Sequence, residues 1–157
     1  DGPGGKRLAL FESGAILLYL AEKTGKLLPA DPAERWHAVQ WVMFQMGGVG
    51  PMFGQLGFFY KFAGKDYEDK RPRDRYVAEA QRLLWVMDGW LATREWFVGG
   101  AYSVADISML GWVRALVDFY GAAEIVGFSD YGNVAAWLDR GLSRPAVQRG
   151  LNIPPSA

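Results

Sequence analysis

The sequence predicts an all-α fold, in which a bundle of helices follows one short strand and one helix. Three observations predict it. Apolar residues recur at helical spacing through most of the chain, glycines and prolines fall where helices would end or begin, and only residues 6–11 alternate in the manner of a strand. Half of the 157 residues are apolar and 15% are aromatic, which is enough to bury the core of one ordinary domain.

The composition excludes several classes of function. The 17 basic residues balance 17 acidic ones, so we expect no nucleic-acid partner. The sequence contains no cysteine, which rules out disulfides and thiolate catalysis within it, and a single histidine, His37, is too few for a histidine metal site. No apolar run reaches the roughly 18 residues of a membrane span, and no signal peptide opens the chain, so we expect a cytoplasmic protein without membrane contact.

The first residues predict the end of one domain and the start of another. Residues 6–11 form a lone strand with nothing to pair with, so we expect the chain to be the C-terminal part of a longer protein. The first helix runs from about Ser13 to Lys23 and ends at Gly25, and its residues 15–21 are apolar all round, which predicts burial between two layers. The predicted division is residues 1–25 as the remnant of an α/β domain, 26–32 as a linker, and 33–157 as a helical domain.

The second helix begins after the linker, with Asp31 as its cap and Pro32 at its first position. Pro51 removes an N–H and crowds the preceding turn, so we expect a kink near 47–51. The glycines at 47, 50, 54 and 57 would share one helix face, which would let another backbone or a ligand come close.

Four further helices are predicted. The apolar residues of the third helix that should face the core extend from Tyr76 to Leu91. Arg75 and Glu79 are expected to form an i,i+4 ion pair on its exposed side. The fourth, from Val104 to about Tyr120, is apolar nearly all round and should be the central helix. Shorter helices follow over residues 134–142 and from Pro145.

The strongest chemical signal is Glu12-Ser13, where the predicted strand runs into the first helix. A helix N-terminus favours an anion, because its dipole and its free N–H groups both attract negative charge. The adjacent Glu12 carboxylate can hold an ammonium group. The pair therefore suits the head of an α-amino acid, which carries both groups on one carbon. The alternative is an ordinary cap, since serine caps helices whatever the ligand.

Residues 11–16, Phe-Glu-Ser-Gly-Ala-Ile, resemble the glutamate-serine signature of glutathione transferases. The resemblance implies that Glu12 pairs with the ammonium of the γ-glutamyl group of glutathione, and that Ser13 and the helix terminus take its carboxylate. It also implies that residues 1–25 are the end of a truncated thioredoxin-like domain. Residues 33–157 would then be the helical C-terminal bundle of this family.

Ser103 and Asp106 form a capping box at the start of the fourth helix, and Tyr102 and Ile107 stand where a hydrophobic staple would pack. The C-terminal domain of glutathione transferases is known for this box and staple. The implied role is folding rather than catalysis. Loss of the cap in Asp106→Ala should destabilise the protein by about 1–2 kcal/mol.

Residues 45–55 resemble the bacterial Nu class of this family and its fungal Ure-type relatives. In that subgroup an arginine near the start of the third helix contacts a glutathione carboxylate, which implies this role for Arg75. The alternative is a solvated arginine paired with Glu79. The resemblance places the pocket for the second substrate at Gln55, Phe58 and Phe59, beside Tyr60. A plain aromatic core is the alternative for at least two of these three aromatic residues.

The resemblance implies a glutathione-dependent transferase or disulfide-bond oxidoreductase, whose second substrate is a small electrophile or a disulfide. Thiolate formation is the key step of such chemistry. The family carries its catalytic hydroxyl or thiol in a part of the thioredoxin-like domain that this sequence lacks, so the catalytic residue is unknown and the chain should hold half a glutathione site. Members of the family are usually two-fold dimers. The resemblance therefore implies a homodimer whose interface lies near the helix that carries the glycines at 47, 50, 54 and 57 and near the start of the third helix. A non-catalytic binding or scaffold module is the alternative.

Overall fold

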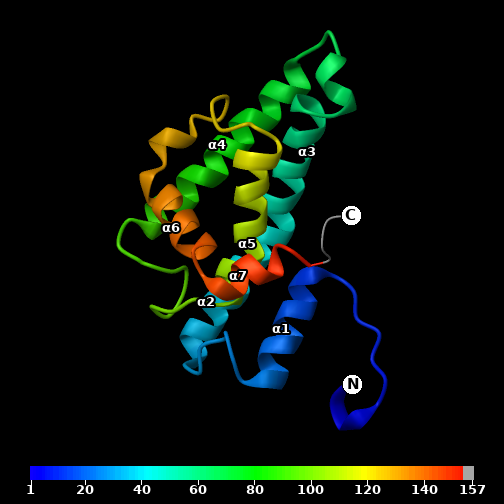
Figure 1. Ribbon diagram of the computed structural model, residues 1–157, viewed down its shortest axis with the longest axis vertical. Helices are drawn as coiled ribbons and strands as arrows, with labels where there is room; N and C mark the ends of the chain where they lie inside the picture. The colour runs from blue at the N-terminus through cyan, green and yellow to red at the C-terminus, as the bar shows by residue number, and fades with distance from the viewer. Residues whose placement is uncertain (154–157) are drawn as a thin grey trace.

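A computed structural model of the protein describes residues 1–153, and Figure 1 shows the arrangement of its helices. The α-helices are α1 (Ser13–Thr24), α2 (Pro32–Phe44), α3 (Gly50–Tyr60), α4 (Arg71–Leu91), α5 (Val104–Arg114), α6 (Gly132–Leu142) and α7 (Pro145–Gly150). Two π-helical segments, η2 (Gln45–Val49) and η4 (Ala115–Phe119), follow α2 and α5 directly. Short 3₁₀ turns occupy η1 (Pro3–Gly5), η3 (Ala63–Asp66) and η5 (Phe128–Asp130). The last four residues of the predicted helical domain, 154–157, lie outside the described residues.

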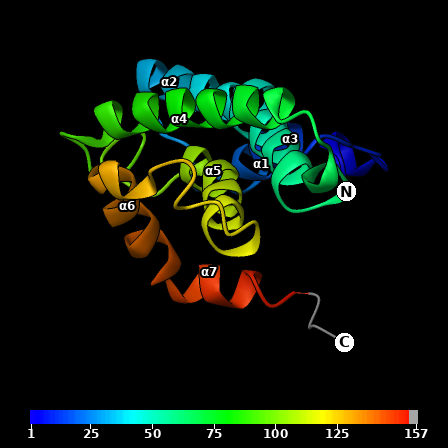
Figure 2. The same cartoon turned by 90° about the horizontal axis from the view of Figure 1, so that it is seen from above.

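The helices are arranged around α5. Seen from above (Figure 2), α2, α3 and α4 form one layer, α5 lies in the middle, and α6 and α7 lie on its other side. Helix α5 packs against α1, α2, α3 and α6. The prediction that this nearly continuous apolar helix is central is therefore confirmed.

The helix ends follow the local chemistry of the sequence. Gly25 ends α1 with φ of 65°, a conformation that glycine adopts without strain. The Asp31 carboxylate accepts a hydrogen bond from the Glu34 N–H at 2.9 Å, and Pro32 opens α2. Both halves of the predicted capping box are present at Ser103 and Asp106. These three predictions are confirmed.

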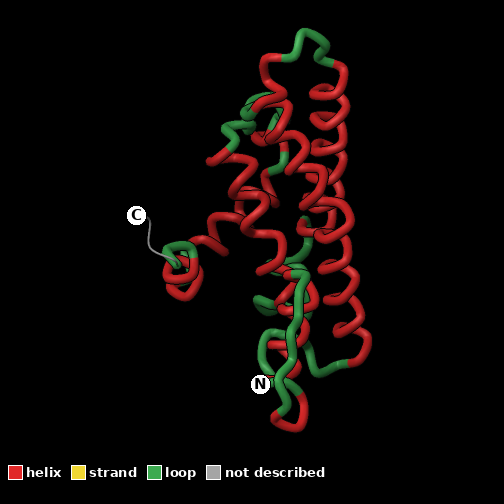
Figure 3. The backbone as a smooth tube through the Cα atoms, turned by 90° about the vertical axis from the view of Figure 1, so that its right-hand side faces the viewer, coloured by secondary structure: helices red, strands yellow, loops and turns green. Residues whose placement is uncertain are grey.

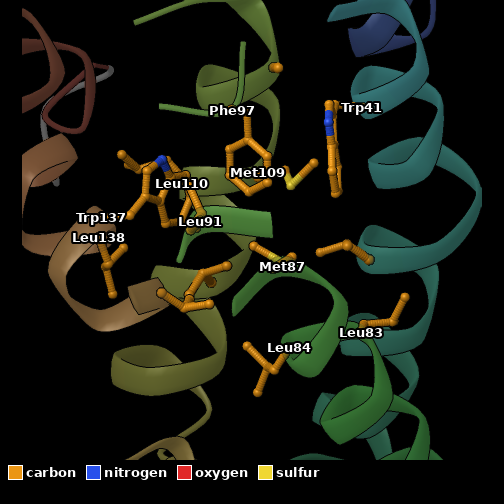
Figure 4. Packing of buried hydrophobic residues seen from close by; sticks show 14 of the residues in the cluster. Trp41, Leu83, Leu84, Met87, Leu91, Phe97, Met109, Leu110, Trp137 and Leu138 are labelled. Carbon is orange, nitrogen blue, oxygen red and sulfur yellow. The ribbon is translucent and has the colours of Figure 1, made fainter. Parts of the chain in front are cut away.

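The core lies where α2, α4, α5 and α6 meet, and Figure 4 shows its side chains. Phe97 lies between two tryptophans, with ring centroids 4.8 Å from Trp41 and 5.2 Å from Trp137. Met87 from α4 and Met109 from α5 are fully buried beside them. A buried side chain of this size stabilises the fold by about 1.5–3 kcal/mol, so this cluster fixes the position of α5.

The strand predicted at residues 6–11 is not formed. The structure has no strand within residues 1–153, and this segment is an extended loop that leads to α1 (Figure 3). A strand needs a neighbour to satisfy its backbone hydrogen bonds, and the described residues offer none here. Helix α1 is likewise covered on one side only, by α5 and α2. Ile16 is 37% and Leu20 is 48% exposed, where burial between two layers was predicted.

The kink predicted near Pro51 takes the form of the π-helical segment η2, after which α3 begins at Gly50. Three of the four glycines of this stripe lie against aromatic side chains of this chain, whereas a Cβ added at Gly47 would meet nothing within 4 Å in the described residues. Trp112 of α5 lies against Gly50 and Gly54, and Tyr120 lies against Gly57. At these three glycines aromatic rings of the same chain take the space that was expected to admit a backbone or a ligand, and sequence spacing alone could not show this.

Candidate glutathione site at the N-terminus of α1

Glu12 and Ser13 lie side by side on the surface at the start of α1. Glu12 has φ of 70° and ψ of 115°, a region that residues with a Cβ rarely adopt. The chain turns here from the extended segment into the helix, whose first hydrogen bond joins the Ile16 N–H to the Glu12 carbonyl at 2.9 Å. Backbone strain of this kind is concentrated at functional sites, so the conformation of Glu12 supports a role in binding.

The first turn of α1 presents free backbone donors. Within residues 1–153, the N–H groups of Ser13, Gly14 and Ala15 have no hydrogen-bond acceptor, and no side chain caps the helix. The helix is 12 residues long, so its dipole adds positive potential at these groups. The arrangement can hold an anion at the helix end.

Ser13 is not the ordinary cap that was its alternative role. Glu12 occupies the cap position, while Ser13 is the first helical residue, and its Oγ donates to the Sδ of Met46 at 3.5 Å. The exposed Glu12 carboxylate has no ion-pair partner in the part of the chain that the structure describes. An ammonium group can therefore approach Glu12 while a carboxylate approaches the amides beside it. Sequence reasoning missed Met46, because no local pattern indicates a contact between α1 and η2.

Arg75 does not join this site within one chain. It lies one turn into α4, which starts at the far end of α3 from the N-terminus of α1 (Figures 1 and 3). Its side chain is 65% exposed, and its guanidinium lies 3.6 Å from the Glu79 carboxylate. The structure thus contains the solvated ion pair that was the alternative role of Arg75.

The three residues predicted for a second-substrate pocket, Gln55, Phe58 and Phe59, lie on α3. Gln55 and Phe58 are exposed, whereas Phe59 is half-buried and stacks on Tyr76 with ring centroids 5.6 Å apart. Phe58 meets the edge of Phe59 at 4.9 Å. Phe58 is 12 residues beyond Met46, so it lies about 18 Å further along the helix axis. The structure therefore does not bring this aromatic group against Glu12 and Ser13.

The capping residues Ser103 and Asp106 belong to a buried network. The Oδ2 of Asp106 accepts from the Ser103 N–H at 2.9 Å and from its hydroxyl at 3.0 Å. The Oδ1 accepts from the Trp137 indole N–H at 2.9 Å and from the Phe97 N–H at 3.1 Å. Burial raises the pKa of Asp106 above its ordinary value, although these hydrogen bonds favour the ionised form. The network supports folding, and its contacts with Phe97 and Trp137 join segments that no short motif links.

Residues 1–153 contain no group of three or more histidines, aspartates and glutamates placed to hold a metal ion. No helix in that range has the length and apolar character needed to cross a membrane.

Comparisons with known proteins agree with this fold. The disulfide-bond oxidoreductase YfcG of Escherichia coli is 41% identical over 148 residues, which are 94% of this chain and 66% of that protein. A glutathione transferase from Pseudomonas putida, solved with one glutathione disulfide per subunit, is 61% identical with a TM-score of 0.96, covering 98% of this chain and 66% of that one. Ure2p5 from Phanerochaete chrysosporium, cocrystallised with 1-(S-glutathionyl)-2,4-dinitrobenzene, is 30% identical with a TM-score of 0.82, covering 93% and 69%.

The chain thus spans somewhat less than two thirds of the length of YfcG, at 66%. Residues 49–145 match the family described as Glutathione S-transferase, C-terminal domain. That match covers more than half of the chain and includes the capping box, the central helix α5 and α6. The chain therefore belongs to the glutathione S-transferase family, with a helical C-terminal domain of that type.

Proposed function

We propose that this protein binds glutathione at the N-terminus of α1, as part of a glutathione-dependent transferase or disulfide-bond reductase of the Nu class. The observation that carries the proposal is the exposed Glu12 carboxylate beside three backbone amides, all without partners within residues 1–153. These groups are complementary to the ammonium and carboxylate of the γ-glutamyl end of glutathione. The glutathione disulfide and the glutathione conjugate bound by the two solved relatives support the same ligand class.

We also propose that residues 1–25 are the end of a thioredoxin-like domain and that the catalytic group belongs to the rest of that domain. Two observations support this division. Leu8, Leu10 and Phe11 are exposed in an extended segment, and Phe11 is 82% exposed. Ile16 and Leu20 leave one face of α1 uncovered. A second layer would bury these apolar side chains and give the extended segment a strand to pair with.

The proposed assembly is a two-fold homodimer through the outer face of α2 and α4. Trp36 and Met43 on α2 are 71% and 51% exposed, and Trp85 on α4 is 70% exposed. An isologous interface would bury these residues on both subunits. In such a dimer, Arg75 of one subunit could contact glutathione only in the site of the other subunit.

Gln55 and Phe58 remain the proposed contacts for a second substrate. We also propose that the protein is located in the cytoplasm, because the cytosol maintains a reducing glutathione pool.

Titration calorimetry with glutathione and with the dipeptide cysteinylglycine tests the proposal. The protein should bind glutathione and should not bind the dipeptide, which lacks the γ-glutamyl group. Glu12→Ala should weaken glutathione binding by about 2–4 kcal/mol, because it removes a charge-assisted contact. Arg149→Ala, an exposed charge change on α7, is the control and should bind normally. Equal affinity of wild type and Glu12→Ala would contradict the proposal.

The catalytic part of the proposal needs a second assay. The 157-residue chain should neither conjugate 1-chloro-2,4-dinitrobenzene to glutathione nor reduce a mixed disulfide of glutathione. The product of the same gene with any coding sequence upstream of the Asp1 codon should do at least one of these. A protein that binds glutathione but is inactive in both forms would instead be a binding module.

A further inference from the structure

We propose that the cleft between α2 and α4 is a second ligand site, which takes a small aromatic carboxylate. The cleft has a volume of about 390 Å³ and lies between two helices of the same layer (Figure 2). Its described lining residues come from α2, α4 and the loop after α4, and none of them belongs to α1. The site is therefore distinct from Glu12 and Ser13, and its volume lies within the usual range of small-molecule sites.

The walls of the cleft are mostly aromatic. Trp41 and Phe44 come from α2, and Val86 and Trp90 come from α4. The ring centroids of Trp41 and Trp90 are 5.2 Å apart, and Phe44 meets Trp41 edge-on at 5.2 Å. Gly89 keeps the cleft open, because a Cβ added there would meet nothing within 4 Å among residues 1–153. A planar apolar ring can therefore pack against aromatic surface in this space.

Trp41 contributes a buried hydrogen-bond donor that lacks an acceptor. The residue is 4% exposed, and its indole Nε1 is buried with no hydrogen-bond partner within residues 1–153. The indole N–H of Trp90, in contrast, donates to the Phe97 carbonyl at 2.9 Å. A buried donor without an acceptor costs free energy, which a ligand oxygen would recover. The indole of Trp41 thus indicates a ligand with a hydrogen-bond acceptor.

Arg94 contributes a positive charge that is held in place. Its guanidinium lies 3.8 Å from the centre of the Trp90 ring. Its Nη1 donates to the Trp90 carbonyl at 3.1 Å and to the Thr93 hydroxyl at 3.2 Å. Its Nε and Nη2 have no hydrogen-bond or ion-pair partner within residues 1–153. These two nitrogens share one edge of the guanidinium, and such an edge binds a carboxylate through two parallel hydrogen bonds.

The charge of the cleft favours an anion. Arg94 is the only charged residue that lines it among the described residues. Glu34 and Glu95 line a neighbouring cleft of about 380 Å³ and have partners there. The Glu34 carboxylate accepts from the Gly99 N–H at 3.1 Å, and the Glu95 carboxylate lies 3.9 Å from the Arg140 guanidinium. A carboxylate on the ligand is therefore favoured over a neutral or cationic group.

The size of the cleft favours a small molecule over a second copy of the chain. Gln40 lies one turn from Trp36 on α2, and Gly89 lies one turn from Trp85 on α4, so the cleft borders the proposed dimer face. A helix of a partner subunit is about 10–12 Å wide with its side chains, and it would not fit in a space of about 390 Å³. The cleft can therefore receive a ligand at the edge of the dimer.

Titration calorimetry of the 157-residue chain with 2-naphthoate tests the proposal. The amide 2-naphthamide has the same rings without the charge, and wild type should bind it about tenfold more weakly, because the charge-assisted bonds are lost. Arg94→Gln should raise the Kd for 2-naphthoate by about tenfold and leave that for 2-naphthamide nearly unchanged. Arg149→Gln, at an exposed position on α7, is the control and should change neither value.

Two further variants locate the ligand. Gly89→Leu should fold, because leucine favours a helix and the space around Gly89 is open among residues 1–153, but its side chain should fill the cleft and abolish binding. Gly111→Leu makes the same change at an exposed position on α5 and should bind normally. Trp41→Phe keeps an aromatic ring and removes the N–H, so the Kd for 2-naphthoate should rise by about threefold.

Four outcomes would overturn the proposal. Wild type that does not bind 2-naphthoate has no such site, and equal binding by Gly89→Leu would place the ligand elsewhere. Equal affinities of wild type for 2-naphthoate and 2-naphthamide would show that the cleft does not select a carboxylate. Loss of binding at protein concentrations where sedimentation detects a dimer would show that a second copy covers the cleft. Glutathione takes no part in these measurements, so their failure would leave the proposed function intact.

Discussion

The indole N–H of Trp137 donates to the carboxylate of Asp106 at 2.9 Å, and this bond joins α6 to the first turn of α5. Asp106 is fully buried and also accepts from Phe97 and Ser103. One carboxylate thus holds together the loop after α4, the cap of α5 and the middle of α6. A capping box alone would involve only the first turn of one helix.

Asp106→Ala should therefore destabilise the protein by about 3 kcal/mol, because it leaves two buried donors of distant segments without an acceptor as well as removing the cap. The structure raises the expected loss above the value for a cap alone. Urea unfolding followed by tryptophan fluorescence measures it. Asp139→Ala, at an exposed position on α6, is the control. A loss no larger than about 2 kcal/mol, the value for a cap alone, would mean that the network contributes nothing beyond the cap.

The pair between Glu79 and Arg82 should make stability depend on pH. Hydrogen bonds from Arg82, at 2.7 and 3.0 Å, lower the pKa of Glu79, and Arg75 adds a smaller effect. Because the folded-state pKa lies below the ordinary value, the stabilisation is present above that ordinary value and is lost as the pH falls through the folded pKa. Glu79→Gln should lower the unfolding free energy by about 0.5 kcal/mol near neutral pH, since the arginines are exposed.

The same two proteins compared at acid pH provide the check on Glu79. Once the carboxyl group is protonated in the folded state, wild type and Glu79→Gln should unfold with the same free energy. A difference that persists unchanged in acid would show that the effect of the substitution is not electrostatic.

Two glycines on neighbouring helices should respond to alanine in opposite directions. A Cβ at Gly57 would lie 2.6–2.9 Å from ring atoms of Tyr120, so Gly57→Ala should destabilise the protein by about 1–3 kcal/mol through overpacking. Among residues 1–153, a Cβ at Gly111 meets nothing within 4 Å, so Gly111→Ala should stabilise α5 by about 0.5–1 kcal/mol through helix propensity. Thermal unfolding of the two variants measures both effects. Stabilisation by Gly57→Ala would mean that Tyr120 does not fill the glycine stripe.

Asp88 on α4 caps the first turn of α6 from outside that helix. Its Oδ1 accepts from the backbone N–H groups of Asn133 at 2.8 Å and Val134 at 3.1 Å, and its Oδ2 accepts from the Asn133 amide at 2.9 Å. Helix α6 has no side-chain cap of its own. Asp88→Ala should therefore destabilise the protein by about 1–2 kcal/mol.

Combining Asp88→Ala with Asn133→Ala checks that assignment by urea unfolding. The two losses should be less than additive, because both substitutions remove the same side-chain contact. Full additivity would indicate that the two residues act independently.

The sequence predicts those parts of the fold that depend on local chemistry. Gly25, Asp31 and Ser103 mark helix ends, because each acts on backbone groups within a few residues. The strand at residues 6–11 was predicted from alternation alone, yet a strand depends on a partner that the described chain does not provide. The filling of the glycine stripe by Trp112 and Tyr120 also depends on distant residues, so spacing along one helix could not reveal it.

The sequence likewise predicted those residues of the candidate site that form a local pattern, but not the contacts that join distant segments. Glu12 and Ser13 were predicted because a carboxylate and a hydroxyl at a helix start form a local pattern. The contact between Ser13 and Met46 was missed, because it joins α1 to a π-helical segment that no sequence pattern indicated. Arg75 was assigned by its position along the chain, and in the structure it lies near the start of α4, where it pairs with Glu79.

The most direct test of the central claim is a glutathione titration followed by ¹H–¹⁵N correlation spectra of the labelled protein. This measurement detects weak binding and locates it residue by residue. We expect the largest shifts at the backbone amides of Ser13, Gly14 and Ala15, and their loss in Glu12→Ala. Shifts that are absent, that lie elsewhere, or that persist unchanged in Glu12→Ala would contradict a glutathione site at the N-terminus of α1.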